Sequence, residues 1–342
     1  MSDEAPDANS ANPGLVFETL LAYQRTAALR TAIELDFFRA LGGGPATSKE
    51  LADRCRASER GIRILADYLT TIGVVEKDGH TYRHSPTSAM FLDPRSPASM
   101  GSIVGLLGHP DVIRPWEQLT EIVRSGRTVL PGEGTVEPEN PVWVEFAKSM
   151  VPMVAPAISP LATAVLAHRT GPIRVLDIAA GHGMFGIEIA RQNPAARVVA
   201  LDWSSVLEVA RENAREAGVL DRMEFLAGSA FDLEFGGPYD AVLLTNFLHH
   251  FDETTCVALL TKIQAALVPG GITATLEFVP NEDRVTPPMA AQFSMMMLGT
   301  TVNGDAYTLR DLERMHRAAG FTGVARDVIT VGPQTIVVGR TT

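Results

Sequence analysis

The sequence predicts an α/β protein, with a helical N-terminal domain followed by a C-terminal doubly wound, mostly parallel sheet that closes with an antiparallel strand. Residues 173–178 are a short apolar run typical of a buried parallel strand, and a helical pattern begins at Met184. Between them lie three glycines in G-x-G-x-x-G spacing, at Gly181, Gly183 and Gly186. Alternating strand-like and helical segments follow, which is the pattern of a doubly wound sheet.

The other elements of this predicted sheet follow in order. Further strands are expected at residues 197–202, 223–227, 241–245 and 272–279, with helices at 204–217, 253–267 and 308–319. Two last strands, near 323–330 and 334–338, flank Gly332 and Pro333. Because a tight turn joins them, they should be antiparallel neighbours.

The first hundred residues predict a winged helix. One helix is expected over residues 15–41, a second begins at the capping box of Thr47 and Glu50, and a third covers 58–72. A hairpin over 74–83 completes the pattern. The expected organisation is a disordered tail at 1–14, the winged-helix domain at 15–98, a helical connector at 99–168 and the sheet domain at 169–342.

The composition excludes several classes of protein. The net charge of −11 argues against a general nucleic-acid or anionic-membrane surface. The two cysteines give no disulfide framework, no apolar run is long enough for a membrane helix, and the acidic N-terminus is not a signal peptide, so a cytoplasmic location is expected. A ligand-sensing DNA-binding regulator is the alternative reading of the winged helix, but residues 15–100 hold eleven basic and ten acidic side chains, too few net charges for a DNA-reading domain.

A glycine turn between a strand and a helix suits two classes of cofactor. A dinucleotide places its pyrophosphate at the helix N-terminus, whereas S-adenosylmethionine carries an ammonium and a sulfonium. The carboxylate of Asp177, inside the strand end, would repel a pyrophosphate and attract those cations. Asp202, about 20 residues after the glycines, is placed to accept hydrogen bonds from ribose hydroxyls, or else caps the next helix, and Trp203 beside it can cover an adenine.

Three sequence blocks together carry a family resemblance. They are the glycine block, the run Leu248, His249, His250 and Phe251 followed by Cys256, and the run from Leu276 and Glu277 to Pro280. With these blocks, residues 15–340 resemble the winged-helix small-molecule O-methyltransferases of the caffeate, acetylserotonin and polyketide-tailoring type. The resemblance implies a Rossmann-like methyltransferase sheet, S-adenosylmethionine as cofactor, a small aromatic or natural-product acceptor, and a homodimer formed through the N-terminal domain.

The resemblance and the strand ends together predict the ligand-binding residues. Ligands of such sheets lie at the carboxyl ends of the strands. The expected cofactor-binding residues are Asp177, Ala179, Gly181, Gly183, Asp202, Trp203, Ser229, Ala230, Phe231, Thr245 and Asn246. Ser229 stands where the family usually has an acid that holds the adenine amine. Flexible methionines and flat aromatics suit an organic ring, so the expected substrate wall is Trp143, Phe146, Met150, Met289, Phe293 and Met296.

The predicted chemistry is methyl transfer to a hydroxyl, with His249 as general base and Glu277 as the acid that orients it. The family pattern has a second acid where this chain has Ala306, and the adjacent Asp305 would point elsewhere. That departure keeps open a relative with altered chemistry, such as C-methylation, decarboxylation or hydroxylation, besides the rival of a nicotinamide dehydrogenase. His250 is expected to be structural, and no metal site is expected because the histidine spacing matches no ligand pattern.

Overall fold

The computed structural model describes residues 11–169, 171–324 and 328–342, which form two compact units divided between Val104 and Gly105. Most of the predicted tail, residues 1–10, lies outside the described residues, as does part of the predicted strand 323–330. Two residues of that expected tail, Pro13 and Gly14, are the first of a helix that Asn12 caps.

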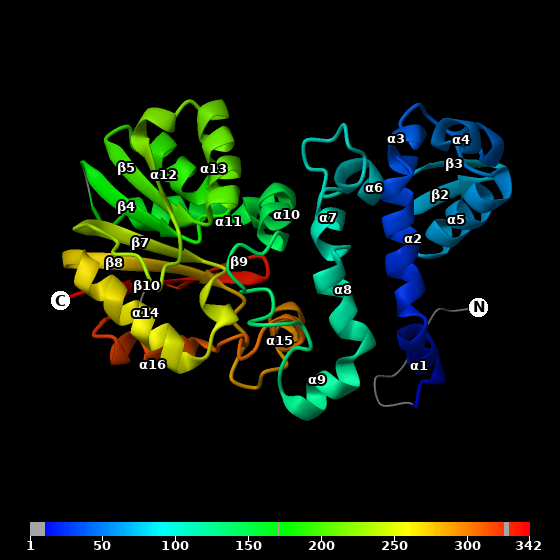
Figure 1. Ribbon diagram of the computed structural model, residues 1–342. Coiled ribbons are helices and arrows are strands. Elements are labelled where there is room, and N and C mark those ends of the chain that lie inside the picture. The colour runs from blue at the N-terminus through cyan, green and yellow to red at the C-terminus, as the bar shows by residue number, and fades with distance from the viewer. Residues whose placement is uncertain (1–10, 170, 325–327) are drawn as a thin grey trace. The chain divides into compact units, whose positions relative to one another are not determined.

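The N-terminal unit is the predicted winged helix (Figure 1). Its helices are α1 (Pro13–Leu20), α2 (Ala22–Glu34), α3 (Phe37–Leu41), α4 (Ser48–Cys55), α5 (Glu59–Thr71) and α6 (Pro86–Phe91). Its small sheet has the order β1 (Ala46–Thr47), β3 (Thr81–His84), β2 (Val75–Asp78). The predicted capping box of Thr47 and Glu50 forms at α4. The expectation of one helix over 15–41 is wrong, because the backbone leaves the helix at Leu21 and turns left-handed at Asp36.

Helix α1 exposes an apolar surface. Leu15, Val16, Phe17 and Leu20 are each 58–66% exposed, and no residue of α1 is buried within the chain. Burial of an apolar side chain is worth roughly 1.5–3 kcal/mol, so a surface of this composition is typical of an interface.

Five further helices lie in the sequence between the winged helix and the large sheet. They are α7 (Ile103–Leu107), α8 (Pro110–Glu117), α9 (Leu119–Ser125), α10 (Val142–Ser149) and α11 (Val151–Leu166). Within the described chain, no single helix is both long and apolar enough to span a membrane, although the bent pair α10 and α11 would meet that test jointly.

The C-terminal unit contains a seven-stranded sheet in the order β6-β5-β4-β7-β8-β10-β9. The strands are β4 (Ile173–Ile178), β5 (Ala196–Asp202), β6 (Met223–Ala227), β7 (Tyr239–Thr245), β8 (Leu267–Glu277), β9 (Val328–Val331) and β10 (Gln334–Arg340). β10 is antiparallel to both β8 and β9, which confirms the predicted closing strand. Strand order reverses at β4, and this reversal opens the crevice where such sheets bind ligands.

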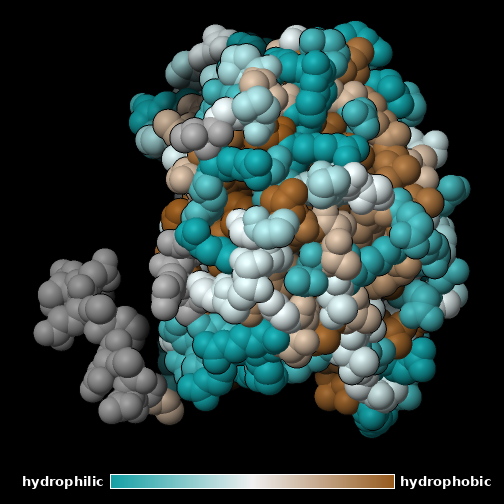
Figure 2. Space-filling model, turned by 90° about the vertical axis from the view of Figure 1, so that its left-hand side faces the viewer, coloured by the Kyte–Doolittle hydropathy of each residue, from teal (hydrophilic) through white to brown (hydrophobic). Residues whose placement is uncertain are grey.

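Helices cover both faces of this sheet (Figure 1). Helices α11, α12 (Met184–Gln192) and α13 (Ser204–Glu216) pack on one face, and α14 (Glu253–Ala266) and α16 (Leu309–Ala318) on the other. Strand β8 begins five residues before the predicted start and runs through Pro269, Gly270 and Gly271. Figure 2 shows hydrophilic groups over the drawn face with apolar ones scattered among them, because the apolar strand residues face the two inner cores.

Candidate active site

The glycine turn between β4 and α12 needs its glycines for close packing. Gly183 has a φ of 73°, a conformation that side chains rarely adopt, and a Cβ there would lie 3.0 Å from the Cβ of Ala210. A Cβ on Gly186 would lie 2.7 Å from Val198 Cγ1 on β5. The turn therefore brings α12 directly against the sheet and directs its N-terminus toward the strand ends.

Asp177 lies fully buried in β4, below this turn. One carboxylate oxygen accepts the backbone N–H of Gly186 at 3.2 Å, and the other has no hydrogen-bond partner. Burial is the main cause that raises the pKa of Asp177 to about 7, and the charge of Asp202 adds to it. A buried carboxylate with a free oxygen favours a nearby cation.

Asp202 ends β5 on the other side of the turn. Its two oxygens accept the backbone N–H groups of Gly181 at 2.8 Å and of Trp203 at 2.7 Å. It does not cap α13, whose N-terminus receives no side-chain hydrogen bond. Burial raises the pKa of Asp202 to about 6. Each oxygen retains a second acceptor site, which suits the paired hydroxyls of a ribose.

A cavity of about 400 Å³ opens at the carboxyl ends of β4, β5, β6 and β7, within the size range of small-molecule sites. Nine of the predicted cofactor-binding residues line it, namely Ala179, Gly181, Asp202, Trp203, Ser229, Ala230, Phe231, Thr245 and Asn246. Asp177 and Gly183 lie behind the lining. Ala179 and Asn246 have φ values of 54° and 56°, so the backbone turns sharply at both strand ends.

The charges of this cavity fit a cationic cofactor. The described lining includes Glu133, Asp202, Asp232 and Asp252, and it contains no lysine or arginine. These carboxylates would repel a pyrophosphate, and the lining offers it no cationic side chain, whereas a sulfonium and an ammonium would be attracted. Together with the free oxygen of Asp177, these residues fit S-adenosylmethionine. In the part of the chain that the structure describes, no group of three or more metal-ligating side chains converges.

His249 and Glu277 form a buried pair beside the cavity. His249 lies in the short 3₁₀ helix η2 (Leu248–His250) after β7, and Glu277 is the last residue of β8. Nδ1 of His249 is hydrogen-bonded to Oε2 of Glu277. The other oxygen, Oε1, accepts the backbone N–H groups of Phe247 at 3.1 Å and Leu248 at 2.9 Å. The bond to Glu277 engages Nδ1, so Nε2 is the ring nitrogen of His249 that this pair leaves for another contact.

The ring of His249 lies between two other rings. Phe293 of α15 (Pro288–Thr300) meets it edge to face at a centroid distance of 4.8 Å, and the His250 ring lies at 4.3 Å. His250 lines the cavity, whereas His249 does not. The alternation of a strand does not hold here, because both histidines lie on a 3₁₀ helix.

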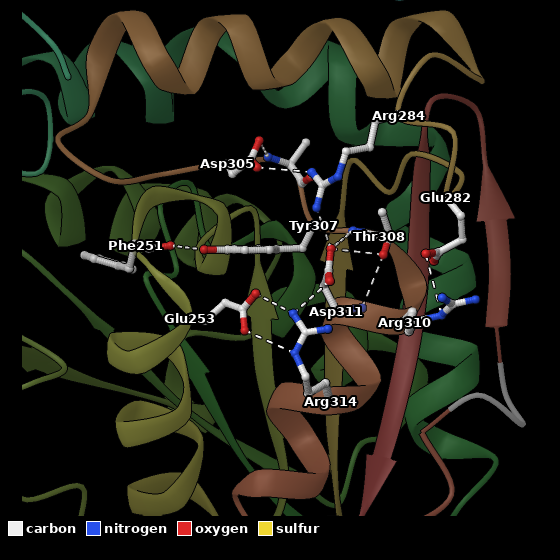
Figure 3. Close-up of polar contacts among 11 residues, drawn as sticks. Phe251, Glu253, Glu282, Arg284, Asp305, Tyr307, Thr308, Arg310, Asp311 and Arg314 are labelled. Atoms are coloured by element: carbon white, nitrogen blue, oxygen red, sulfur yellow. Dashed lines mark hydrogen bonds and ion pairs between the residues drawn. The ribbon is translucent and has the colours of Figure 1, made fainter. Parts of the chain in front are cut away.

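Ala306 is buried near His249 and leaves the histidine with one carboxylate partner. The backbone of Asp305 donates to the carbonyl of His249 at 2.9 Å, but its side chain turns to Arg284 at 3.1 Å (Figure 3). Arg284 also bonds Asp311 at 2.8 Å, and Arg314 links Asp311 to Glu253. Asp305 is therefore held by arginine and does not replace the missing acid, as the sequence predicts.

Of the predicted substrate residues, Trp143 and Phe146 line the cavity. The structure does not bring the methionines to it: Met150 is buried elsewhere, Met289 is 62% exposed, and Met296 lines a separate hollow beside Trp116. Phe293 reaches His249 instead. Sequence reasoning missed Glu133, Val302 and Asn303, which line the cavity from irregular segments. Thr128 and Thr135 connect these segments, because they donate hydrogen bonds to backbone carbonyls of residues 299–301. No local sequence pattern predicts a contact between residues so far apart in the chain.

Comparisons with known proteins agree with this site. Family models match an O-methyltransferase domain at residues 162–322 and an O-methyltransferase dimerisation domain at 17–94. A solved structure from Nostoc punctiforme, described as a candidate O-methyltransferase, is 46% identical, covers 97% of this chain and 100% of its own, and has a TM-score of 0.93.

Two further relatives extend the comparison. A Streptomyces glaucescens protein, the tetracenomycin polyketide synthesis 8-O-methyl transferase, is 28% identical over 98% of each chain. Human N-acetylserotonin methyltransferase in complex with S-adenosylmethionine is 22% identical over 98% of this chain and 99% of its own, and its TM-score of 0.82 confirms the fold. The chain therefore belongs to the family of S-adenosylmethionine-dependent O-methyltransferases that carry an N-terminal dimerisation domain.

Proposed function

We propose that this enzyme transfers the methyl group of S-adenosylmethionine to a hydroxyl of a small aromatic acceptor, with His249 as general base. The observation that carries the proposal is the buried hydrogen bond between His249 and Glu277, next to His250 of the cavity lining. A histidine whose Nδ1 is held by a carboxylate presents a basic Nε2 in a fixed direction.

The residues divide the work. When bound, S-adenosylmethionine supplies an already activated methyl group, so the protein has to align the acceptor and remove its proton. Asp202 accepts the ribose hydroxyls, and the acidic lining attracts the cationic end. Nε2 of His249 takes the hydroxyl proton, and Glu277 stabilises the imidazolium that forms. Glu277 itself is fixed by two backbone N–H groups, so the histidine loses little energy in orienting.

The lining of the cavity supports an aromatic acceptor. Trp143 and Phe146 meet edge to face at a centroid distance of 5.7 Å, and Phe231, Phe247 and Phe251 form a second aromatic cluster. Such walls bury flat apolar rings. Three relatives are named for the methylation of a polyketide, a hydroxynaphthoate and acetylserotonin, which supports an aromatic acceptor for this enzyme.

The assay for this proposal combines S-adenosylmethionine labelled in its methyl group with a panel of phenols, naphthols and polyketide-like hydroxyarenes. We expect mass spectrometry to show the label on an acceptor oxygen. Label on a carbon atom, or loss of a carboxyl group without label, would replace O-methylation by the second candidate, altered chemistry on the same cofactor. The absence of a second acid at Ala306 is what keeps that candidate in the experiment.

We also propose a homodimer, supported by the dimerisation domain at residues 17–94 and by the exposed apolar surface of α1. Light scattering should give twice the chain mass for the full-length protein. Replacing Leu15, Phe17 and Leu20 together by serine should weaken the dimer, because each loses apolar burial worth roughly 1.5–3 kcal/mol. The matched control replaces Gln24 and Arg25, which are exposed and polar, by serine. A triple variant that remains fully dimeric at low micromolar concentration would show that the dimer interface lies elsewhere.

The cytoplasm remains the proposed location. Both cysteines, Cys55 and Cys256, are buried and free. Thiols kept reduced in this way suit a reducing compartment.

A further inference from the structure

The turn that carries His249 is held through its main chain as well as through the side chain of the histidine. The carbonyl of His249 accepts the backbone N–H of Asp305 at 2.9 Å. Two residues later, the carbonyl of Phe251 accepts the hydroxyl of Tyr307 (Figure 3). Both donors belong to one short segment, residues 304–307, which lies just before α16 in the chain. This segment therefore contacts the backbone on both sides of the turn.

Gly304 allows the segment to approach the turn closely. A Cβ at this position would lie 2.4 Å from the carbonyl oxygen of His249 and 3.1 Å from the carbonyl carbon of His250. Both atoms belong to the main chain, so rotation of a side chain could not relieve the clash. The N–H of Gly304 also donates to Oγ1 of Thr301 at 2.9 Å. The packing of the segment against the turn therefore requires glycine here.

The segment is itself anchored to its surroundings (Figure 3). The guanidinium of Arg284 donates to the carboxylate of Asp305 at 3.1 Å and to the carbonyl of Ala306 at 3.3 Å. Ala306 and Tyr307 are buried, and α16 begins directly afterwards with a capping box. Burial is the main cause that raises the pKa of Tyr307 above its usual value, so its hydroxyl keeps its proton and remains a donor.

These contacts bear on the direction of Nε2 of His249. The side chain of His249 is bonded to Glu277 through one ring nitrogen, and a ring held at one atom can still move with its backbone. Hydrogen bonds to the carbonyls of residues 249 and 251 restrict that movement. Proton transfer depends on placement, since a displacement of about 1 Å can lower a rate by roughly 10²-fold.

We propose that residues 304–307 form a clamp that positions the general base, and that Tyr307 is a positioning residue of the reaction. The inference rests on the proposed function and assigns a new residue to the same site. None of residues 304–307 lines the cavity, so the clamp acts on the reaction through the backbone of the turn and not by touching a ligand.

Tyr307→Phe tests the clamp with the smallest change, because it removes the hydroxyl and keeps the ring. Turnover of a simple naphthol should fall by roughly 5- to 100-fold, the scale of one buried hydrogen bond left unmade. The loss should shrink toward one for nitro-substituted naphthols that are ionised before they bind, because these need no base. A merely structural defect would lower turnover equally for all acceptors. An equal loss across the series, or no loss with the naphthol, would overturn the proposal.

Tyr239→Phe is the matched control. The hydroxyl of Tyr239 also donates to a backbone carbonyl in the interior, that of Phe235 at 2.6 Å, and Tyr239 does not line the cavity. This variant loses the same kind of hydrogen bond, but its turnover should have no dependence on the pKa of the acceptor beyond that of the wild type. Gly304→Ala should show the same dependence as Tyr307→Phe with a larger loss, because it displaces the whole segment.

Hydrogen exchange followed by mass spectrometry measures the clamp without any turnover. Amides of residues 247–252 should exchange roughly 5- to 100-fold faster in Tyr307→Phe than in wild type, and at the wild-type rate in Tyr239→Phe. Unchanged exchange in Tyr307→Phe would reject the clamp. Full turnover in His249→Ala would instead reject the proposed base, so the two failures are distinguishable.

Discussion

Replacing His249 by alanine is expected to lower turnover by roughly 10²–10⁴-fold, the usual contribution of a general base. The affinity for S-adenosylhomocysteine should not change, because His249 lies outside the cavity lining and contacts Glu277, His250 and Phe293. Steady-state kinetics and calorimetry on the same protein separate the two effects. Near-full turnover in His249→Ala would leave alignment of the acceptor as the only source of catalysis.

Glu277→Gln should lose nearly as much turnover as His249→Ala. The amide oxygen can still accept the N–H groups of Phe247 and Leu248, but the amide NH₂ then faces Nδ1. That contact favours the tautomer with the proton on Nε2, which cannot accept another. The double variant should be little worse than His249→Ala, since an orienting acid matters only while its base is present. Glu216→Gln, at the exposed end of α13, is the matched control and should keep full activity.

Asp202→Asn is expected to weaken S-adenosylhomocysteine binding by about 1.5–3 kcal/mol, roughly 10- to 100-fold, the scale of hydrogen bonds to a charged group. Asparagine has a single acceptor oxygen and cannot keep both the Gly181 and Trp203 contacts while bonding a ribose. Calorimetry measures the loss, with Asp221→Asn as control, at an exposed position of the 3₁₀ helix η1 (Leu220–Arg222). An unchanged affinity would remove Asp202 from the cofactor site.

The same carboxylates predict how cofactor binding depends on pH. The pKa of ligand-free Asp202 is raised to about 6 and that of Asp177 to about 7, so both are largely protonated at pH 5 and ionised at pH 8. A ligand with ammonium and ribose groups binds the ionised form, so affinity should rise from pH 5 to pH 8 and level off above that. Binding at pH 6 should release protons to the buffer. A cofactor affinity that falls from pH 5 to pH 8 would contradict the prediction that the ionised carboxylates favour binding.

The strands, the winged helix and many of the residues that line the cavity could be predicted from the sequence because each depends on local pattern. The strand from Ile173 to Ile178 and the glycine turn are contiguous, and Asp202 follows at a spacing that the fold imposes. The family resemblance then located His249 and Glu277, which are 28 residues apart in the chain but meet at neighbouring strand ends.

The acceptor side of the cavity could not be predicted in the same way. The methionines of α15 suggest a soft apolar wall, but the helix rotates Met289 to the surface and directs Phe293 to His249. Glu133 and Asn303 reach the cavity through irregular segments held by Thr128 and Thr135, contacts of more than 160 residues' separation. His250 lines the cavity because residues 248–250 form a 3₁₀ helix, in which the two-residue alternation of a strand does not hold.

The central claim is that His249 removes the acceptor proton, and the most direct measurement compares wild type with His249→Ala on acceptors of decreasing hydroxyl pKa at one pH. A base matters only while the acceptor holds its proton. The account predicts that the wild-type advantage in turnover is largest for simple naphthols and shrinks toward one for nitro-substituted acceptors that are ionised before they bind. A ratio that stays constant across the series would show that His249 does not act as the base.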